Sequence, residues 1–252
     1  MLPSFPSKLA PWLALALACA ALAAVRGAAA SPGPGAPVSL KCEYLVDPLG
    51  IDVRNPRLFW IPTHPGRGQR QSAYQILVSR DPACAKGEVW DSGKVASAAF
   101  THVVAKGRPL VANGTYFWKV RTWDAAGTAS PWSGVAKFST GLFDGSDWKA
   151  KWIGGGNLLR REFDVASDVA RAFVYMSGIG YSELRLNGEK VGTNVLDPAW
   201  TTYDKRVLYV AHDVTALVRK GRNALGVMLG EGWHKKRELI LQLHLELAGG
   251  KT

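Results

Sequence analysis

The chain has 252 residues, of which 47% are apolar and 20% are charged. This composition is typical of a globular protein with one or two domains, and it excludes an intrinsically disordered chain. The net charge of +11 is spread along the sequence, with a single dense basic cluster at Lys235-Lys-Arg237. No reading helix or stacking-sheet motif accompanies that cluster, so we expect no nucleic-acid partner.

Residues 1–30 have the pattern of a secretory signal peptide. Lys8 supplies a positive charge, an Ala/Leu-rich run covers 9–25, and Ala28-Ala-Ala30 offers small residues for cleavage. The apolar run is short for a membrane span and Pro11 interrupts it near its start. We therefore expect cleavage, export to the periplasm or the medium, and no stable membrane span afterwards.

The cysteines and histidines give no metal site. Once the leader is removed, Cys42 and Cys84 remain, in a chain destined for an oxidising compartment. A disulfide between them and two buried free thiols are equally consistent with the sequence. The five histidines show no ligand spacing, so neither a metal nor a cofactor is expected.

A linker and a first β-domain follow the leader. Residues 31–38 are rich in Pro and Gly and are expected to form an unstructured linker. Short β-rich runs separated by Gly, Pro and Asp then predict an antiparallel sandwich over 39–146. Asn113-Gly-Thr115 matches a glycosylation sequon, although an Asn-Gly turn explains it equally well. The runs are 58–60, 73–78, 89–90, 116–123 and 136–138.

A second β-domain is expected over 147–252. In it, Asn187-Gly188 lies between two runs that alternate apolar and polar residues, which predicts a hairpin with a type I′ turn. Apolar runs at 207–210 and 224–229 are further predicted strands. The polar crossing between them is expected to hold one short helical turn, capped by Asp213 or Thr215.

The last predicted strand runs from Leu239 to Leu247, with leucine at every second position. Gly249-Gly250 follows, and such a turn calls for a return strand that the two remaining residues cannot form. We therefore expect the second sandwich to be incomplete at its C-terminus, with an exposed apolar edge.

Several motifs of the second domain occur in a characteristic order. They are Leu186-Asn-Gly-Glu-Lys-Val-Gly192, Pro198-Ala-Trp-Thr-Thr-Tyr203, Asp213-Val-Thr215, Gly221-Arg-Asn223 and Leu229-Gly-Glu-Gly-Trp233. Together they resemble the N-terminal accessory module of bacterial α-L-rhamnosidases of glycoside hydrolase family 78. Upstream, Gln71-Ser-Ala-Tyr-Gln-Ile76 and Trp90-Asp-Ser-Gly-Lys-Val95 resemble the fibronectin type III-like module that precedes it in that family.

This resemblance implies an all-β fold of two consecutive antiparallel sandwiches, fibronectin type III-like and then jelly-roll-like. It also implies a parent enzyme that hydrolyses terminal α-L-rhamnose from glycosides or polysaccharides with inversion. The catalytic carboxylates of the family lie in a downstream helical barrel, whereas this sequence predicts no helical region of any size. We therefore expect a chain truncated before the barrel, with no catalytic residue and no activity alone.

A sugar-contacting or domain-docking surface is the remaining functional candidate. Trp200, Tyr203, Trp233 and His234 are aromatic residues in turn-rich segments, where β-sandwiches carry binding residues. The simpler expectation for the two tryptophans is a structural role, sealing the ends of the sandwich. The expected partners are a rhamnose-containing glycan or the missing catalytic domain. The alternative is a free-standing exported carbohydrate-binding or adhesion protein.

Overall fold

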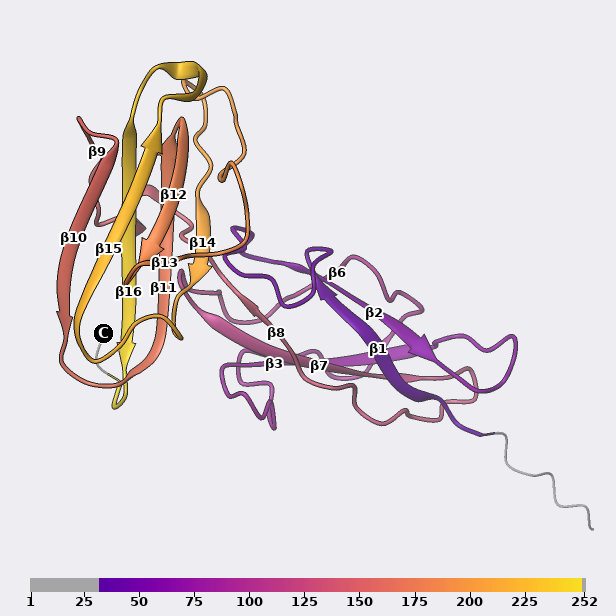
Figure 1. Ribbon diagram of the computed structural model, residues 1–252. Helices are drawn as coiled ribbons and strands as arrows, with labels where there is room; N and C mark the ends of the chain where they lie inside the picture. Colours follow the sequence, from indigo (N-terminus) through magenta and orange to yellow (C-terminus); the bar gives the residue numbers. More distant parts are fainter. Residues whose placement is uncertain (1–31, 251–252) are drawn as a thin grey trace, which may run out of the picture.

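The computed structural model describes residues 32–250. The signal peptide expected over 1–30 lies outside the described residues. The described chain forms two β-sandwiches, and in Figure 1 the strands of the second cross those of the first at a large angle. Its helices are two 3-10 turns, η1 (Gly145–Asp147) and η2 (Gly232–His234), and no helix within 32–250 is long and apolar enough to cross a membrane.

The first sandwich is built from two antiparallel sheets. One has the order β1 (Gly35–Cys42), β2 (Arg57–Thr63), β6 (Val103–Val104). The other has the order β4 (Trp90–Asp91), β3 (Ala73–Ser79), β7 (Thr115–Trp123), β8 (Ala136–Ser139), and β5 (Val95–Ala96) also pairs with β3.

Strand β1 corrects the expected start of this domain. Gly35 pairs with Thr63, so residues 35–38 of the predicted linker belong to the sheet. Proline is tolerated in an edge strand, where a missing N–H breaks no ladder hydrogen bond. Pro37 therefore does not exclude a strand, because β1 lies at the edge of its sheet.

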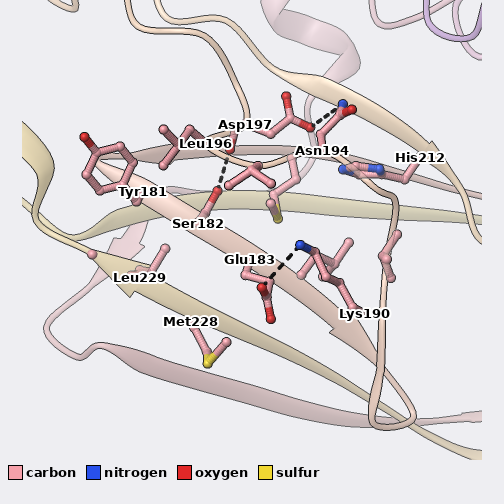
Figure 2. Close-up of a pocket in the computed structure, with 15 residues that line it drawn as sticks. Tyr181, Ser182, Glu183, Lys190, Asn194, Leu196, Asp197, His212, Met228 and Leu229 are labelled. Atoms are coloured by element: carbon pink, nitrogen blue, oxygen red, sulfur yellow. Dashed lines mark hydrogen bonds and ion pairs between the residues drawn. The ribbon is translucent and has the colours of Figure 1, made fainter.

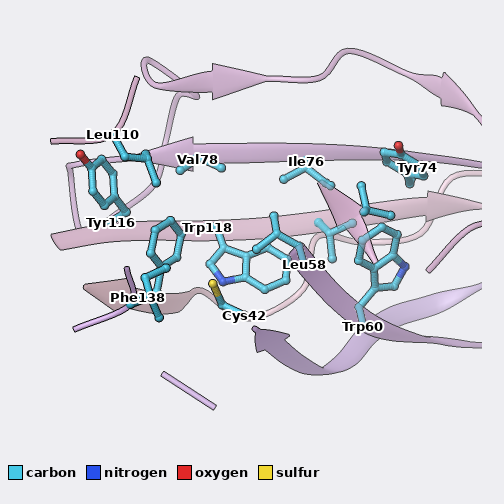
Figure 3. Close-up of a cluster of buried hydrophobic side chains, with 13 residues drawn as sticks. Cys42, Leu58, Trp60, Tyr74, Ile76, Val78, Leu110, Tyr116, Trp118 and Phe138 are labelled. Carbon is cyan, nitrogen blue, oxygen red and sulfur yellow. The ribbon is translucent and has the colours of Figure 1, made fainter. Parts of the chain in front are cut away.

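Aromatic side chains fill the space between the two sheets (Figure 3). Trp60 and Trp118 are almost fully buried, and Cys42 lies in the same cluster. Cys84 is also buried, and its thiol contacts the Leu77 carbonyl at 3.8 Å. Both cysteines are free, so the disulfide is absent and the buried-thiol alternative holds. Burial raises the pKa of both thiols, which keeps them protonated and unreactive.

The second sandwich also has two antiparallel sheets. One has the order β10 (Leu158–Val165), β15 (Gly221–Gly230), β12 (Tyr181–Leu186), β13 (Glu189–Lys190). The other has the order β14 (Val210–Asp213), β11 (Val169–Ile179), β16 (Glu238–Leu247), β9 (Ile153–Gly154). Their inner faces share a cluster of buried aliphatic side chains, so the all-β fold of two antiparallel sandwiches is confirmed.

The predicted hairpin joins β12 to β13. Asn187 and Gly188 have φ of 54° and 92°, as a type I′ turn requires. The Asn187 side chain accepts a hydrogen bond from the Ala224 N–H at 2.9 Å and donates to the Leu217 carbonyl at 2.9 Å. The turn residue thus fixes the loop between β14 and β15 as well as the hairpin.

The helical turn in that loop is confirmed, and Asp213 caps it. The Asp213 carboxylate accepts the Thr215 N–H at 3.0 Å, and the Val218 N–H donates to the Val214 carbonyl at 3.0 Å. The preceding strand begins at Val210, later than its apolar run predicts.

The two sandwiches are joined by an interdomain clamp formed by Asn113, Arg171, Tyr175 and Tyr209. The Tyr175 hydroxyl donates to the Asn113 side-chain oxygen at 2.8 Å, and Arg171 donates to the Asn113 carbonyl at 2.8 Å. Tyr209 accepts the Leu142 N–H at 2.8 Å and donates to the Leu142 carbonyl at 3.0 Å. The side chain of the predicted sequon is therefore engaged between the domains.

Strand β16 confirms the last predicted strand. It pairs with β11 along its length, but on its other side the described residues offer only β9, at Glu238 and Leu239. Leu241 and Leu243 line an apolar groove of about 720 Å³ that also contains Phe163 of β10 and Val227 of β15. Beyond Leu239, the outer edge of β16 has no strand partner between residues 32 and 250.

Candidate functional site

The structure brings all four predicted aromatic residues together at one end of the second sandwich. Trp200 and Tyr203 come from the long connection before β14, while Trp233 and His234 lie in η2 after β15. The ring centroids of the two tryptophans are 5.7 Å apart, with their planes tilted by 30°. Those of Tyr203 and His234 are 4.5 Å apart. We call these four residues the aromatic ledge.

Both tryptophans of the ledge are exposed. Trp200 keeps 69% of its surface accessible and Trp233 keeps 81%, and neither belongs to the core cluster. The expectation that they seal the ends of the sandwich is therefore wrong. Both lie on loops that project beyond the strands, which strand periodicity does not predict.

Two glycines hold the η2 loop against the turn between β11 and β12. A Cβ at Gly180 would meet the Gly230 carbonyl oxygen at 2.2 Å, and a Cβ at Gly232 would meet the Gly180 Cα at 3.0 Å. Both glycines also have positive φ. This close backbone approach leaves Trp233 on the outer side of the loop.

A cavity of about 290 Å³ lies between the ledge and the strands. Besides the ledge, it is lined by Gly180, Tyr181, Leu196, Pro198 and Gly232. Apart from the His234 imidazole, its lining side chains are aromatic or apolar, and the two indoles in it are exposed to solvent. Such a surface suits a flat ligand with an apolar face.

A second hollow, which we call the polar pocket, adjoins the ledge (Figure 2). It has about 290 Å³ and shares Tyr181 and Leu196 with the first cavity. Its floor consists of buried apolar side chains from three strands and a loop, and its rim is polar. The floor residues are Met176, Leu184, Val191 and Leu229, and the rim residues are Glu183, Lys190, Asn194, Asp197 and His212.

The rim holds two pairs of side chains, and each pair combines a hydrogen-bond donor with a carboxylate acceptor. Asn194 donates its amide to the Asp197 carboxylate at 3.2 Å, and the Ser182 hydroxyl holds the Asp197 carbonyl at 2.9 Å. The Glu183 carboxylate forms ion pairs with Arg185 at 2.9 Å through one oxygen and with Lys190 at 3.5 Å through the other. In Figure 2 these pairs face each other across the pocket.

His212 forms the wall of the pocket on β14. Burial lowers the pKa of its imidazole, and the charge of Asp197 opposes this effect only in part. The ring is therefore neutral near pH 7, with one nitrogen that donates and one that accepts a hydrogen bond.

The other carboxylates of this region have structural roles. Asp213 caps the turn after β14, and Glu231 forms an ion pair with Arg237 at 2.9 Å. Within residues 32–250 no group of three His, Cys, Asp or Glu side chains could hold a metal ion. The aromatic ledge offers rings for stacking, and the polar pocket offers groups for hydrogen bonds to a polar ligand.

Sequence reasoning did not find the polar pocket. Its rim residues come from β12, β13, the following loop and β14, and of these only Lys190 lies in one of the motifs found in the sequence. The predicted hairpin was the only sequence feature that could have indicated part of the pocket. Pairing across it places Lys190 opposite Arg185 and therefore near Glu183.

Comparisons with known proteins identify both sandwiches. The family model described as Rha78A-like, N-terminal immunoglobulin domain matches residues 37–144, and that of the alpha-L-rhamnosidase N-terminal domain matches residues 167–250. A curated α-L-rhamnosidase from Alteromonas sp. (strain LOR) is 37% identical over 222 residues, which cover 80% of this chain and 24% of that protein. One from Streptomyces avermitilis is 47% identical over 112 residues, or 44% of this chain and 11% of that protein.

Solved structures agree. The α-L-rhamnosidase from Dictyoglumus thermophilum superimposes with a TM-score of 0.81 at 37% identity, over 86% of this chain and 28% of that one. The enzyme from Aspergillus terreus gives a TM-score of 0.75 at 26% identity, over the same shares of 86% and 28%. The chain thus spans about a quarter of the length of the curated relatives that it matches over most of its own length.

Proposed function

Since this chain carries the N-terminal modules of the α-L-rhamnosidase family, we propose that it is a non-catalytic part of such an enzyme whose aromatic ledge contacts a rhamnose-containing glycan. For the whole enzyme we propose hydrolysis of terminal α-L-rhamnose from glycosides or polysaccharides, with inversion. We also propose export, on the pattern of residues 1–30.

The exposure of two neighbouring indoles is the observation that carries this proposal. Trp200 and Trp233 add nothing to the core, yet they present 69% and 81% of their surfaces to solvent at a centroid separation of 5.7 Å. An exposed apolar patch with a polar surround is typical of a binding surface. The flat face of an indole matches the C–H face of a sugar ring, and the adjoining polar pocket supplies hydrogen-bonding groups.

Binding of the purified chain to a rhamnose-terminated polysaccharide tests the ledge. We expect Trp200→Ala and Trp233→Ala each to lower affinity about tenfold, because a stacked aromatic ring contributes on the order of 1–2 kcal/mol. Affinity electrophoresis measures the retention. Far-UV circular dichroism and the thermal midpoint should stay unchanged, since both side chains are exposed.

Trp152→Ala is the matched control. Trp152 is 44% exposed but lies outside the ledge, so its loss should leave retention intact. Equal retention of all variants would overturn sugar contact and favour the ledge as a docking surface for another domain. Release of rhamnose from an aryl rhamnoside by the purified chain would contradict the non-catalytic role.

The alternative is a free-standing carbohydrate-binding or adhesion protein with the same ledge. The enzyme assignment is better supported, because the curated relatives are α-L-rhamnosidases of which this chain spans about a quarter.

A further inference from the structure

We propose that the polar pocket beside the ledge binds one terminal 6-deoxyhexose, with its hydroxyls on the rim and its methyl group on the apolar floor. This inference rests on the proposed sugar contact and assigns to it a second, adjoining subsite. The ledge would then stack the next sugar of the same chain.

The size of the pocket fits one ring. Its volume of about 290 Å³ is just below the range of about 300–1,000 Å³ typical of drug-sized ligand sites, as suits a smaller ligand. A disaccharide would extend past Tyr181 and Leu196, which line both hollows, onto the ledge. In this arrangement the terminal sugar would lie in the polar pocket and the next sugar on the ledge.

The rim offers a donor beside an acceptor at two places. Asn194 and Asp197 form one pair at 3.2 Å, and Lys190 and Glu183 form the other at 3.5 Å. A sugar hydroxyl both donates and accepts, so the carboxylate of each pair can accept a hydrogen bond from one hydroxyl while the amide or ammonium donates to the neighbouring hydroxyl. Hydrogen bonds to charged groups are the stronger ones, which suits the recognition of adjacent hydroxyls.

The floor has the opposite character. Met176, Leu184 and Leu229 are apolar side chains that expose only 2%, 2% and 5% of their surfaces. A buried hydroxyl without a hydrogen-bond partner is costly, whereas a methyl group gains from the same contact. A sugar with a methyl group in place of its 6-hydroxyl therefore fits this floor better.

Titration of the purified chain with L-rhamnose and with L-mannose tests the floor. The two sugars differ only by the 6-hydroxyl, so they form a matched pair of ligands. We expect L-rhamnose to bind at least about fivefold more tightly, measured by calorimetry or by NMR shifts of the pocket residues. Equal affinities, or no binding of either sugar, would overturn the inference.

Glu183→Gln and Asp197→Asn test the rim. Each should weaken L-rhamnose binding about tenfold, because a charge-assisted hydrogen bond is lost while the shape is kept. Lys190→Gln tests the same rim at a partly exposed position where misfolding is not a concern. Glu189→Gln is the control, since this carboxylate is exposed on β13 and does not line the pocket.

The outcomes separate the subsite from the ledge. If the rim variants bind L-rhamnose like the unsubstituted chain while Trp200→Ala loses the polysaccharide, the pocket inference fails and the proposed function stands. If the unsubstituted chain does not bind the polysaccharide, the proposed function fails. The monosaccharide titration then still decides whether the pocket binds a sugar.

Discussion

Two histidines make the stability of this fold sensitive to mild acid. Burial lowers the pKa of both His212 and His244 below the ordinary value of 6.5. The unfolded chain therefore takes up protons at a pH where the folded chain does not, and folding loses stability as the pH falls through 6.5. Glu246 is an acidic group whose pKa is also lowered in the folded chain. Its hydrogen bond with Arg171 favours the charged carboxylate and lowers the pKa below 4.5. Its stabilising contribution is present above that value and is lost in stronger acid.

We expect the free energy of unfolding to fall between about pH 7 and pH 5, and again below about pH 4.5. Urea unfolding at a series of pH values measures this dependence. The double variant His212→Gln/His244→Gln should flatten the upper part of the profile and leave the lower part unchanged. An unchanged slope between pH 7 and pH 5 in that variant would contradict the assignment.

At the scale of elements, the hairpin between β12 and β13 supports both the core and the polar pocket. Its turn places Lys190 on the rim beside Glu183, while Asn187 ties the hairpin to the loop before β15. Gly188 has φ of 92°, and a Cβ there would meet nothing within 4 Å. Its requirement for glycine is therefore purely conformational.

Gly188→Ala should lower the free energy of unfolding by about 1–2 kcal/mol, because a side chain disfavours the left-handed region. Gly226 in β15 is the matched control: an added Cβ also meets nothing within 4 Å, but its φ is not positive. Gly226→Ala should leave stability unchanged or raise it by up to about 1 kcal/mol. Urea unfolding compares the two, and equal effects would refute the conformational explanation.

The alternation of apolar and polar residues, together with the turn residues, predicted most strands of this fold. The strands that it missed or misplaced have identifiable physical causes. Alternation was sufficient for β7 and β16, and Asn187-Gly188 for the hairpin turn, because each signal lies within a few residues. Strand β1 was missed because its Pro and Gly residues are typical of a linker as well as of an edge strand.

Features that depend on long-range geometry could not be predicted. The four ledge aromatics were identified by residue type and loop context, but their exposure depends on where two distant loops meet. The polar pocket combines Glu183, Asp197 and His212 from separate segments, with no shared spacing. Whether Cys42 and Cys84 pair likewise depends on their separation in space, which the sequence does not contain.

At the scale of the whole molecule, the interdomain clamp couples the two sandwiches. Tyr175 is fully buried and packs with Phe173 and Leu142, while its hydroxyl reaches Asn113 and, at 3.2 Å, the Thr140 carbonyl. The contact combines apolar burial with satisfied hydrogen bonds. The orientation of the ledge relative to the first sandwich is set by these few groups.

Tyr175→Phe should lower the free energy of unfolding by about 1 kcal/mol, because the hydroxyl that the Asn113 side-chain oxygen and the Thr140 carbonyl share as a donor is lost while the ring is kept. Chemical unfolding, followed separately by probes in each sandwich, measures the loss. Tyr181→Phe is the control, since that hydroxyl lies on an exposed residue. A loss confined to one sandwich, with the other unaffected, would show that the clamp does not couple them.

The clamp and the hairpin share a chemical liability. Asparagine followed by glycine loses its amide when the next backbone nitrogen attacks the side-chain carbonyl, and such residues are thermolabile. In the folded chain the Gly114 N–H donates to the Thr140 hydroxyl at 2.8 Å, and the oxygens of Asn113 and Asn187 accept hydrogen bonds from Tyr175 and Ala224. We therefore expect both asparagines to deamidate more slowly in the folded chain than in the unfolded chain. The extent of deamidation at these two positions would then increase with the time that a sample has spent unfolded.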